Sequence, residues 1–221
     1  MNKNKILIFT DLDGSILHRD TFKFDQIKDY IKKLINLGIH IIPNSSKTES
    51  EIIEFNNDLG EDLAYISENG SVINNLNLLN SNFPNKIILS REKEELVKIF
   101  KNNVSENLQS KCKFISNMNK KDQINIFGLS ETKLKNALDR KYTEPFLFEG
   151  NKNEKKDLTK ILKKNSLTIQ EGGRVINLCD NVNKVKSMNK VLKIYKKIES
   201  NTKVIAVGDN YNCLLYTSDA A

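Results

Sequence analysis

The sequence has no tryptophan, only 3 prolines and 3 cysteines, and no long apolar run. Its apolar runs, such as residues 6–9 and 39–42, are far too short to cross a bilayer. Cys112, Cys179 and Cys213 are widely separated and odd in number, which indicates neither a disulfide framework nor a zinc-binding spacing. We therefore expect no membrane partner and no disulfide scaffold.

Arginine is also scarce, because lysine outnumbers it 31 to 4 in a chain of formal net charge +7. Lysines scattered over helix faces usually form a solvated surface, and no zinc finger, stacking motif or recognition helix accompanies them. We therefore expect no nucleic-acid partner. Residues 1–5 (MNKNK) lead directly into a strand-like run without the features of a secretory signal, so we expect a cytoplasmic protein.

The chain has 221 residues, of which 38% are hydrophobic and 29% charged. This is enough for one domain, or for a core with an insertion, and enough to bury a hydrophobic core. No repeat of fixed period is visible, so a solenoid or propeller is not indicated.

Strands and helices alternate in the first part of the chain. Residues 5–10 (KILIFT) form a short apolar run that ends at an acidic turn, as a strand buried on both faces does. Residues 24–37 have apolar side chains at helical spacing, with Gly38 as a C-terminal cap. Further elements are expected at 39–43 (strand), 48–56 (helix) and 63–67 (strand), followed by a turn at 68–70. This βαβαβ order predicts a parallel sheet with right-handed crossovers.

The pattern changes between residues 85 and 180, where an α+β insertion fits better than more doubly wound core. Helices are expected there at 91–102, 130–142 and 155–165, and strands at 123–128, 145–148, 166–170 and 174–178. The core resumes near residue 181, with a helix at 184–197 and a strand at 203–207. We predict an α/β fold, with a doubly wound, Rossmann-like parallel core at 1–84 and 181–212, an inserted domain at 85–180, and the C-terminal part of the core missing.

Polar clusters follow the predicted core strands. Asp11 and Asp13 end the first strand, and two carboxylates two residues apart on an extended segment can be directed toward one site. Oxygen-rich clusters suit magnesium, and a carboxylate so placed could attack phosphorus. Taken alone, Asp-x-Asp-Gly is more often an acidic turn after a buried strand than a catalytic site.

Three more clusters lie at predicted strand or helix ends. Residues 44–48 (NSSKT) could cradle an anion, although an ordinary helix N-cap has the same composition. Lys184 begins the helix after the insertion, and residues 208–212 (GDNYN) carry an acid beyond a strand; a surface lysine and a turn are the alternatives. Because ligands bind beyond the carboxyl ends of strands in open α/β sheets, we expect the clusters to meet there.

In this order the four clusters resemble the motifs of the haloacid-dehalogenase-like phosphohydrolases: an Asp-x-Asp pair, a Ser or Thr, a Lys and a final acidic loop. The resemblance implies that Asp11 is the nucleophile that forms an aspartyl-phosphate and that Asp13 is the general acid. It also implies that the phosphoryl group is held by Ser45, Lys184 and Asn212.

The same resemblance implies an Mg²⁺ cofactor, bound by Asp11, the backbone carbonyl of Asp13, and Asp209. An anionic carboxylate can approach an anionic phosphate only if cations offset their repulsion. The insertion would be a cap domain that closes over the substrate.

A narrower resemblance, to the mannosyl-3-phosphoglycerate phosphatases, rests on five segments. They are 44–52 (NSSKTESEI), 67–70 (SENG), 124–130 (INIFGLS), 140–146 (RKYTEPF) and 171–178 (EGGRVINL). It implies that Lys47, Arg174 and Glu144 bind the glycerate and sugar of the substrate, because anionic groups need cations and a carboxylate accepts bonds from hydroxyls. Without it, Arg174 is a surface arginine and Glu144 a turn residue.

These resemblances imply a magnesium-dependent phosphatase that hydrolyses mannosyl-3-phosphoglycerate, a small phosphorylated sugar-glycerate, to mannosylglycerate and phosphate. Two alternatives stay open. One is a related sugar-phosphate phosphatase with a different cap preference, and the other is a catalytically silent phosphosugar-binding protein.

The chain also departs from the family pattern near its end. Cys213 stands where the fourth motif normally has a second acid, and Asn183 precedes Lys184 in place of the usual acid. Residues 213–221 (CLLYTSDAA) resemble the translation of a transposase-type sequencing adapter, so we expect a non-native tail. We further expect an exposed sheet edge and a weakened magnesium site.

Overall fold

The computed structural model describes residues 5–209. The predicted phosphate-binding residue Asn212 and the predicted tail 213–221 lie outside these residues. The described chain forms two compact units, a first unit of residues 5–46, 52–89 and 183–209 and a second unit of 47–51 and 90–182. No helix among residues 5–209 is long and apolar enough to cross a membrane.

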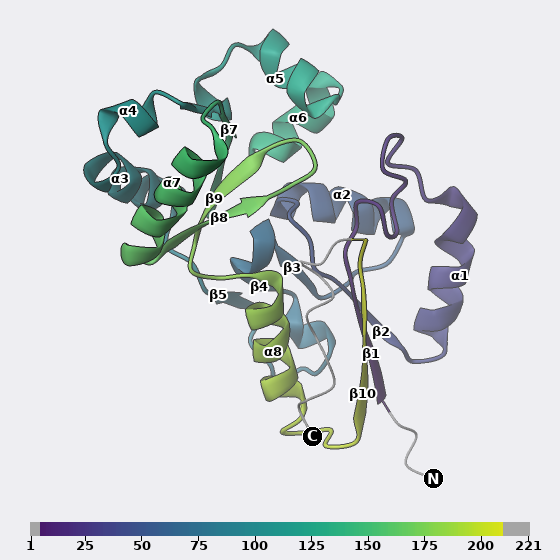
Figure 1. Ribbon diagram of the computed structural model, residues 1–221. Helices are drawn as coiled ribbons and strands as arrows, with labels where there is room; N and C mark the ends of the chain where they lie inside the picture. Colours follow the sequence, from purple (N-terminus) through teal and green to yellow (C-terminus); the bar gives the residue numbers. More distant parts are fainter. Residues whose placement is uncertain (1–4, 210–221) are drawn as a thin grey trace. The chain divides into compact units, whose positions relative to one another are not determined.

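The elements are labelled in chain order in Figure 1. The strands are β1 (Lys5–Thr10), β2 (His40–Pro43), β3 (Tyr65–Ser67), β4 (Val72–Asn74), β5 (Lys86–Ile88), β6 (Cys112–Phe114), β7 (Thr143–Phe148), β8 (Leu167–Glu171), β9 (Ile176–Asp180) and β10 (Thr202–Val207). The α-helices are α1 (Asp25–Asn36), α2 (Glu49–Leu59), α3 (Lys93–Asn103), α4 (Glu106–Gln109), α5 (Lys120–Phe127), α6 (Glu131–Leu138), α7 (Lys152–Lys164) and α8 (Lys184–Tyr195). Short 3₁₀ helices are η1 (Glu68–Gly70), η2 (Leu76–Leu78) and η3 (Ile115–Asn117).

The first unit is built on a parallel sheet of order β10-β1-β2. Thr10 at the end of β1 lies opposite Val207 of β10 and Pro43 of β2, so the carboxyl ends of these strands are level. A parallel bridge between Asn44 and Ile66 places β3 beside the end of β2. The predicted α/β fold class with a parallel core is confirmed.

Beyond β3 the strands run antiparallel, in the order β3-β4-β5. The strands β4 and β5 were not predicted from the sequence, and they extend β3 by antiparallel pairing. Each has three residues. Three residues are too few to show an alternating apolar pattern, so pairing with neighbouring strands decides their conformation.

Both faces of the parallel sheet of the first unit are covered by helices. Ile42 packs with β1 residues and with apolar residues of α8, including Val191. Its neighbour Ile41 packs in a separate cluster with Ile31 of α1 and Ile52 of α2. Successive side chains of a strand point to opposite faces, so the apolar run of β2 supplies both hydrophobic clusters, as in a doubly wound sheet.

The second unit contains an antiparallel sheet of order β6-β7-β9-β8. One hydrophobic cluster joins this sheet to α3 and α7 and includes Phe100, Phe146 and Leu158. The sheet residues Cys112 and Cys179 are both buried and not disulfide-bonded, and burial raises the pKa of the Cys112 thiol to about 11. That thiol therefore stays protonated at neutral pH and packs as a small apolar side chain.

The helix α5 corrects the predicted strand at 123–128. The Asn119 side chain accepts a hydrogen bond from the backbone N–H of Asp122 and caps the start of the helix, and Gly128 ends it in the left-handed conformation, with φ +62°. Apolar side chains of α5 and α6 pack around Ile115, so packing within this cluster stabilises the run that resembles a strand as a helix. The helix predicted at 130–142 is also shorter, because α6 ends at Leu138.

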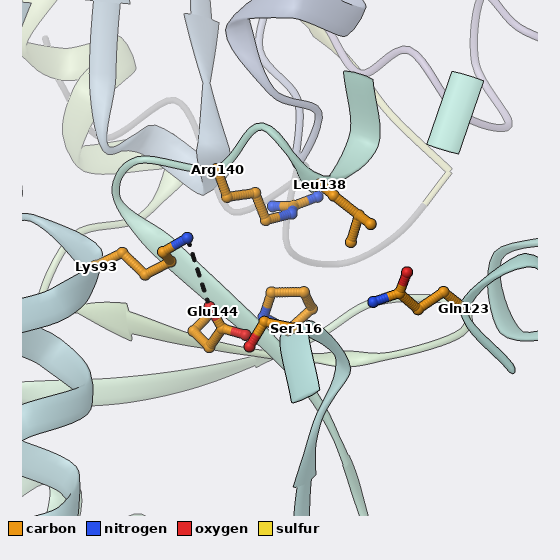
Figure 2. Close-up of a pocket in the computed structure, with 7 residues that line it drawn as sticks. Lys93, Ser116, Gln123, Leu138, Arg140 and Glu144 are labelled. Carbon is orange, nitrogen blue, oxygen red and sulfur yellow. Dashed lines mark ion pairs between the residues drawn. The ribbon is translucent and has the colours of Figure 1, made fainter. Parts of the chain in front are cut away.

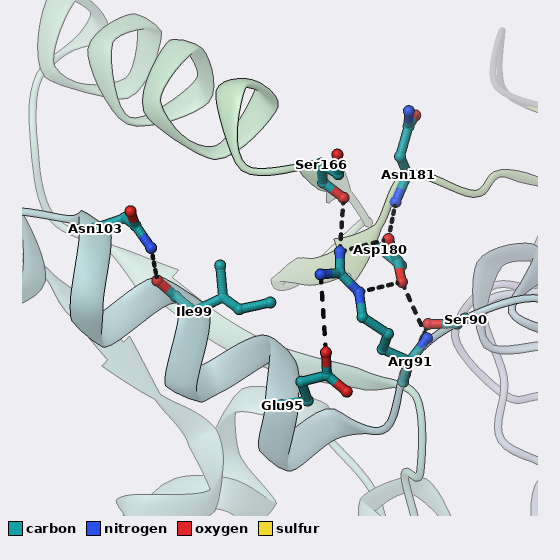
Figure 3. A network of polar contacts seen from close by, with 8 residues as sticks. All are labelled: Ser90, Arg91, Glu95, Ile99, Asn103, Ser166, Asp180 and Asn181. Carbon is teal, nitrogen blue, oxygen red and sulfur yellow. Dashed lines mark hydrogen bonds and ion pairs between the residues drawn. The ribbon is translucent and has the colours of Figure 1, made fainter.

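Arg91 and Asp180 join the two ends of the second unit's long segment (Figure 3). Arg91 donates to the Asp180 carboxylate from Nε at 2.8 Å, from Nη2 at 2.9 Å and from its backbone N–H at 3.0 Å. Nη2 also donates to the backbone carbonyl of Ser166 at 3.1 Å. Burial by itself would raise the pKa of Asp180, but the hydrogen bonds from Arg91 and Asn181 and the charge of Arg91 together lower that pKa.

Candidate active site

Asp11 lies directly after β1 and is 8% exposed. Its Oδ1 accepts a hydrogen bond from the backbone N–H of Leu12 at 2.8 Å, and its Oδ2 lies 2.6 Å from Nζ of Lys184. The Lys184 side chain is 9% exposed, so this ion pair is buried. The sheet and α8 thus bring together two of the predicted site residues, a carboxylate and the cation that offsets its charge.

A tight loop after Asp11 positions Asp13. The backbone carbonyl of Leu12 accepts hydrogen bonds from the N–H groups of Ser15 and Leu17. The backbone carbonyl of Leu17 accepts a hydrogen bond from the N–H of Gly14. Leu12 itself is fully buried and anchors the loop in the core. Asp13 therefore stands one residue beyond an anchored position, at the same end of β1 as Asp11.

Asp209 lies just beyond β10 and approaches the same loop. A Cβ atom on Gly14 would collide with Oδ2 of Asp209, and Gly14 has φ +75°. Both observations require glycine at this position. Oδ2 of Asp209 also accepts a hydrogen bond from Nη2 of Arg19 at 3.1 Å, which the sequence did not indicate.

Ser45 follows β2 at the same edge of the sheet and is fully buried. Its N–H donates to the carbonyl of Ile66 at 3.0 Å, and its carbonyl accepts from the N–H of Asn69 at 3.0 Å. The preceding residue, Asn44, donates from its backbone to Thr10 at 2.8 Å and from Nδ2 to the carbonyl of Lys184 at 3.0 Å. Hydrogen bonds thus tie the segment around Ser45 to the segments that carry Asp11 and Lys184.

The predicted magnesium ligands are oxygen atoms near the carboxyl ends of β1 and β10. Among residues 5–209, no group of three or more His, Cys, Asp or Glu side chains is placed to hold a metal, so two carboxylates and the carbonyl of Asp13 would have to suffice. Magnesium binds few protein oxygens and keeps several waters, which fits such a set. The absence of a side chain on Gly14 lets the Asp209 carboxylate reach the Asp13 loop, which supports this fit.

In the second unit, Glu144 lines a cavity of about 210 Å³ (Figure 2). The carboxyl group is almost fully buried, and its Oε2 lies 4.0 Å from Nζ of Lys93. The cavity is lined by Lys93, Ser116, Gln123, Leu138, Arg140, Glu144 and Pro145. The sequence indicated Glu144 alone. Arg140 and Pro145 lie in the segment that carries the resemblance, whereas Lys93 is distant in sequence and gave no signal.

Burial dominates the electrostatics of Glu144. It raises the pKa of the carboxyl group more than hydrogen bonds from Ser116 and the charges of Lys93 and Arg140 lower it. Oε1 of Glu144 has no hydrogen-bond partner among the described residues. This oxygen could therefore form a hydrogen bond with a ligand in the cavity.

Lys47 and its neighbours begin α2. Nζ of Lys47 lies 3.2 Å from Oε1 of Glu51, while Thr48 and Glu51 exchange hydrogen bonds in the reciprocal pattern of a capping box. Thr48 Oγ1 donates to the carbonyl of Asn136. The helix-cap interpretation of residues 44–48 is therefore correct for Thr48, and Lys47, which precedes α2, is paired with an acid in the first turn of that helix.

Arg174 is exposed and lies between β8 and β9. Its Nη1 would be 2.9 Å from a Cβ atom on Gly128, the residue that ends α5. The structure therefore brings together two of the segments that carried the narrower resemblance, 124–130 and 171–178.

The described geometry is that of a doubly wound α/β protein with carboxylates and a buried lysine at the carboxyl ends of its parallel strands. The sequence model of the haloacid dehalogenase-like hydrolases matches residues 8–214. The chain belongs to this family, as its motifs predicted.

Curated relatives show a narrower similarity. A glucosyl-3-phosphoglycerate/mannosyl-3-phosphoglycerate phosphatase from Persephonella marina is 27% identical over 201 residues, which are 87% of this chain and 72% of the relative. A mannosyl-3-phosphoglycerate phosphatase from Pyrococcus horikoshii is 28% identical over 221 residues, 93% of this chain and 84% of the relative. A solved HAD/COF-like hydrolase from Plasmodium vivax superposes with a TM-score of 0.66 at 16% identity, over 96% of this chain and 80% of the other, and confirms the fold.

Proposed function

We propose that the protein is a cytoplasmic, magnesium-dependent phosphatase that hydrolyses mannosyl-3-phosphoglycerate to mannosylglycerate and phosphate. The observation that carries this proposal is the buried contact between Asp11 Oδ2 and Lys184 Nζ at the carboxyl end of β1. A carboxylate held beside a lysine at this edge is suited to attack an anionic phosphate, because the cation offsets the repulsion.

The proposed reaction has two steps. A carboxylate oxygen of Asp11 forms a bond to phosphorus while the bond from phosphorus to the sugar-glycerate oxygen breaks, and Asp13 gives that oxygen its proton. A water molecule, deprotonated by Asp13, then attacks phosphorus and releases phosphate from Asp11. Ser45 and Lys184 hold the phosphoryl oxygens; Asn212, outside the described residues, remains a prediction in the same role.

Asp11, the carbonyl of Asp13, and Asp209 would hold Mg²⁺. A bound magnesium ion supplies positive charge that stabilises the charge developing on the phosphoryl oxygens. The protein's own contribution is to hold these oxygens in place, through the anchored loop after β1 and the close approach of Asp209 to Gly14.

We further propose that residues 85–180 act as a cap, and that Lys47, Glu144 and Arg174 recognise the sugar-glycerate part of the substrate. The cavity beside Glu144 supports this, since it offers a carboxyl oxygen that has no partner within residues 5–209 and two nearby cations. The names of the two phosphatase relatives support the choice of substrate.

A phosphate-release assay over a panel of phosphosugars tests the proposal. We expect mannosyl-3-phosphoglycerate to give the highest kcat/KM, chelation of divalent metal to abolish turnover, and added Mg²⁺ to restore it. We expect Asp11→Asn to lower kcat by about a thousandfold or more. A higher kcat/KM for another phosphosugar would show that the protein is a related sugar-phosphate phosphatase with a different substrate. Binding of phosphosugars without turnover would identify a catalytically silent binding protein.

A further inference from the structure

The turn Glu68–Gly70 has three consecutive residues in the left-handed region of backbone space. The φ angles of Glu68, Asn69 and Gly70 are +46°, +60° and +96°. All three residues are buried, and the first two have side chains, which makes this conformation unfavourable. Such a run persists only where the surrounding structure determines it, and strain of this kind is concentrated at functional sites.

One side of the turn holds the segment of Ser45. The N–H of Asn69 donates to the carbonyl of Ser45 at 3.0 Å, and the N–H of Ser45 donates to Ile66, in the strand that leads into the turn. Both backbone groups of Ser45 are therefore fixed by the chain around the turn. The side chains of the adjoining residues also carry buried polar atoms without a protein partner among the described residues: Asn44 Oδ1, Ser67 Oγ and Asn69 Nδ2.

The other side of the turn holds the start of α8. Ser187, one helical turn after Lys184, donates from Oγ to the carbonyl of Gly70 at 2.5 Å. A Cβ atom on Gly70 would collide with the backbone carbonyl group of Asn183, whose side chain caps α8. The turn therefore packs directly against the backbone that positions Lys184.

We propose that Glu68–Gly70 is a positioning element that sets the separation between Ser45 and Lys184, and that Gly70 is its decisive residue. The turn makes a backbone hydrogen bond to Ser45, through the N–H of Asn69. On its other side, the backbone of Gly70 packs against the backbone of Asn183 at the start of α8. The two residues come from a strand end and a helix start that are distant in sequence, so a short rigid turn between them can fix their spacing. This inference rests on the proposed function, in which both residues hold the phosphoryl group.

Gly70→Ala tests the proposal against a matched control. The added methyl group must displace the start of α8, whereas Gly38→Ala places a methyl group on a residue with φ +81° and no atom within 4 Å of it. Both variants carry backbone strain, but only the first disturbs α8. For folded protein we expect Gly70→Ala to lower kcat by about a hundredfold and to weaken the binding of inorganic phosphate by about tenfold. Gly38→Ala should change either value by less than about twofold.

Several outcomes overturn the proposal. One is a folded Gly70→Ala variant that retains the parent's kcat and phosphate affinity. Another is an equal loss of kcat and phosphate affinity in Gly70→Ala and Gly38→Ala. If Gly70→Ala does not fold, Ser187→Ala decides, because it removes the hydrogen bond to Gly70 without adding an atom. We expect it to weaken phosphate binding by about threefold or more, and unchanged binding would contradict the inference.

Amide hydrogen exchange separates this inference from the proposed function. If the parent releases no phosphate from any phosphosugar, the proposed function fails, but the positioning role can still be measured. In Gly70→Ala or Ser187→Ala, we expect faster exchange at Ser45, Asn69 and Ser187 together, with no change in Gly38→Ala. Faster exchange at Ser187 alone would show that the turn does not couple the two segments.

Discussion

Asp11 and Lys184 form a buried ion pair, in which each charge offsets the cost of burying the other. Both side chains are about nine-tenths buried, and their charged atoms lie 2.6 Å apart. Lys184→Met would leave the Asp11 carboxylate without this cation, so we expect the free energy of unfolding to fall by about 3 kcal/mol. Lys190→Met, on an exposed position of the same helix, should change it by less than about 0.5 kcal/mol.

Urea unfolding of both variants measures this difference, and a second substitution sharpens it. Adding Asp11→Asn to Lys184→Met removes the buried charge, so part of the lost stability should return. If Lys184→Met is as stable as Lys190→Met, the ion pair contributes nothing to folding.

Glu144 makes stability depend on pH. Its folded-state pKa is raised by burial, so the folded protein binds this proton more tightly than the unfolded chain does. The cost of ionising Glu144 therefore appears as pH rises above the ordinary value of 4.5 and grows up to the folded-state pKa. We expect Glu144→Gln to gain stability relative to the parent as pH is raised from 4.5 to 8.

Chemical denaturation across this pH range measures the effect, with Glu149→Gln as the control. Glu149 follows the same strand, but its side chain is 53% exposed, so its substitution removes one charge without relieving burial. The same pH trend in both variants would mean that burial of Glu144 does not govern the change.

At the scale of elements, the Arg91–Asp180 pair joins the segment before α3 to the end of β9. Because Asp180 has a lowered pKa, this stabilisation is present at neutral pH and is lost as pH falls below the ordinary value of 3.8 and through the folded-state pKa. We expect a double-mutant cycle with Arg91→Met and Asp180→Asn to give a coupling energy of about 1–3 kcal/mol at pH 7.

The exposed pair Lys120–Glu131 is the control for that cycle. Its side chains are 61% and 67% exposed, so its coupling should be below about 1 kcal/mol. A coupling at Arg91–Asp180 no larger than this would show that the three hydrogen bonds do not hold the two segments together.

At the scale of the whole molecule, the two units have separate hydrophobic clusters. Phe146 is fully buried in the second unit and Ile42 is 1% exposed in the first. We expect Phe146→Ala to lower stability by about 3–5 kcal/mol and to accelerate amide exchange mainly in the second unit. Ile42→Ala should accelerate exchange mainly in the first unit, and equal acceleration in both units would show that they unfold as one.

The sequence by itself determined the parallel core. Continuous apolar runs such as KILIFT are visible without any tertiary information, and the order of strands and helices leaves few topologies. It also determined the family, because Asp11, Asp13, Ser45 and Asp209 follow predicted strands and Lys184 begins a predicted helix, in a fixed order. These features are local in the chain, and local composition is sufficient to reveal them.

Tertiary structure alone decided the rest. The short strands β4 and β5 have no pattern of their own. Helix α5 looked like a strand because Ile124 and Ile126 flank the polar Asn125, and this alternation is typical of a strand. The Lys93–Glu144 and Arg91–Asp180 pairs join residues distant in sequence, and so do the contacts of the Glu68–Gly70 turn with Ser45 and Ser187. Their energies come from burial and from partners supplied by other elements, and those partners exist only once the chain has folded.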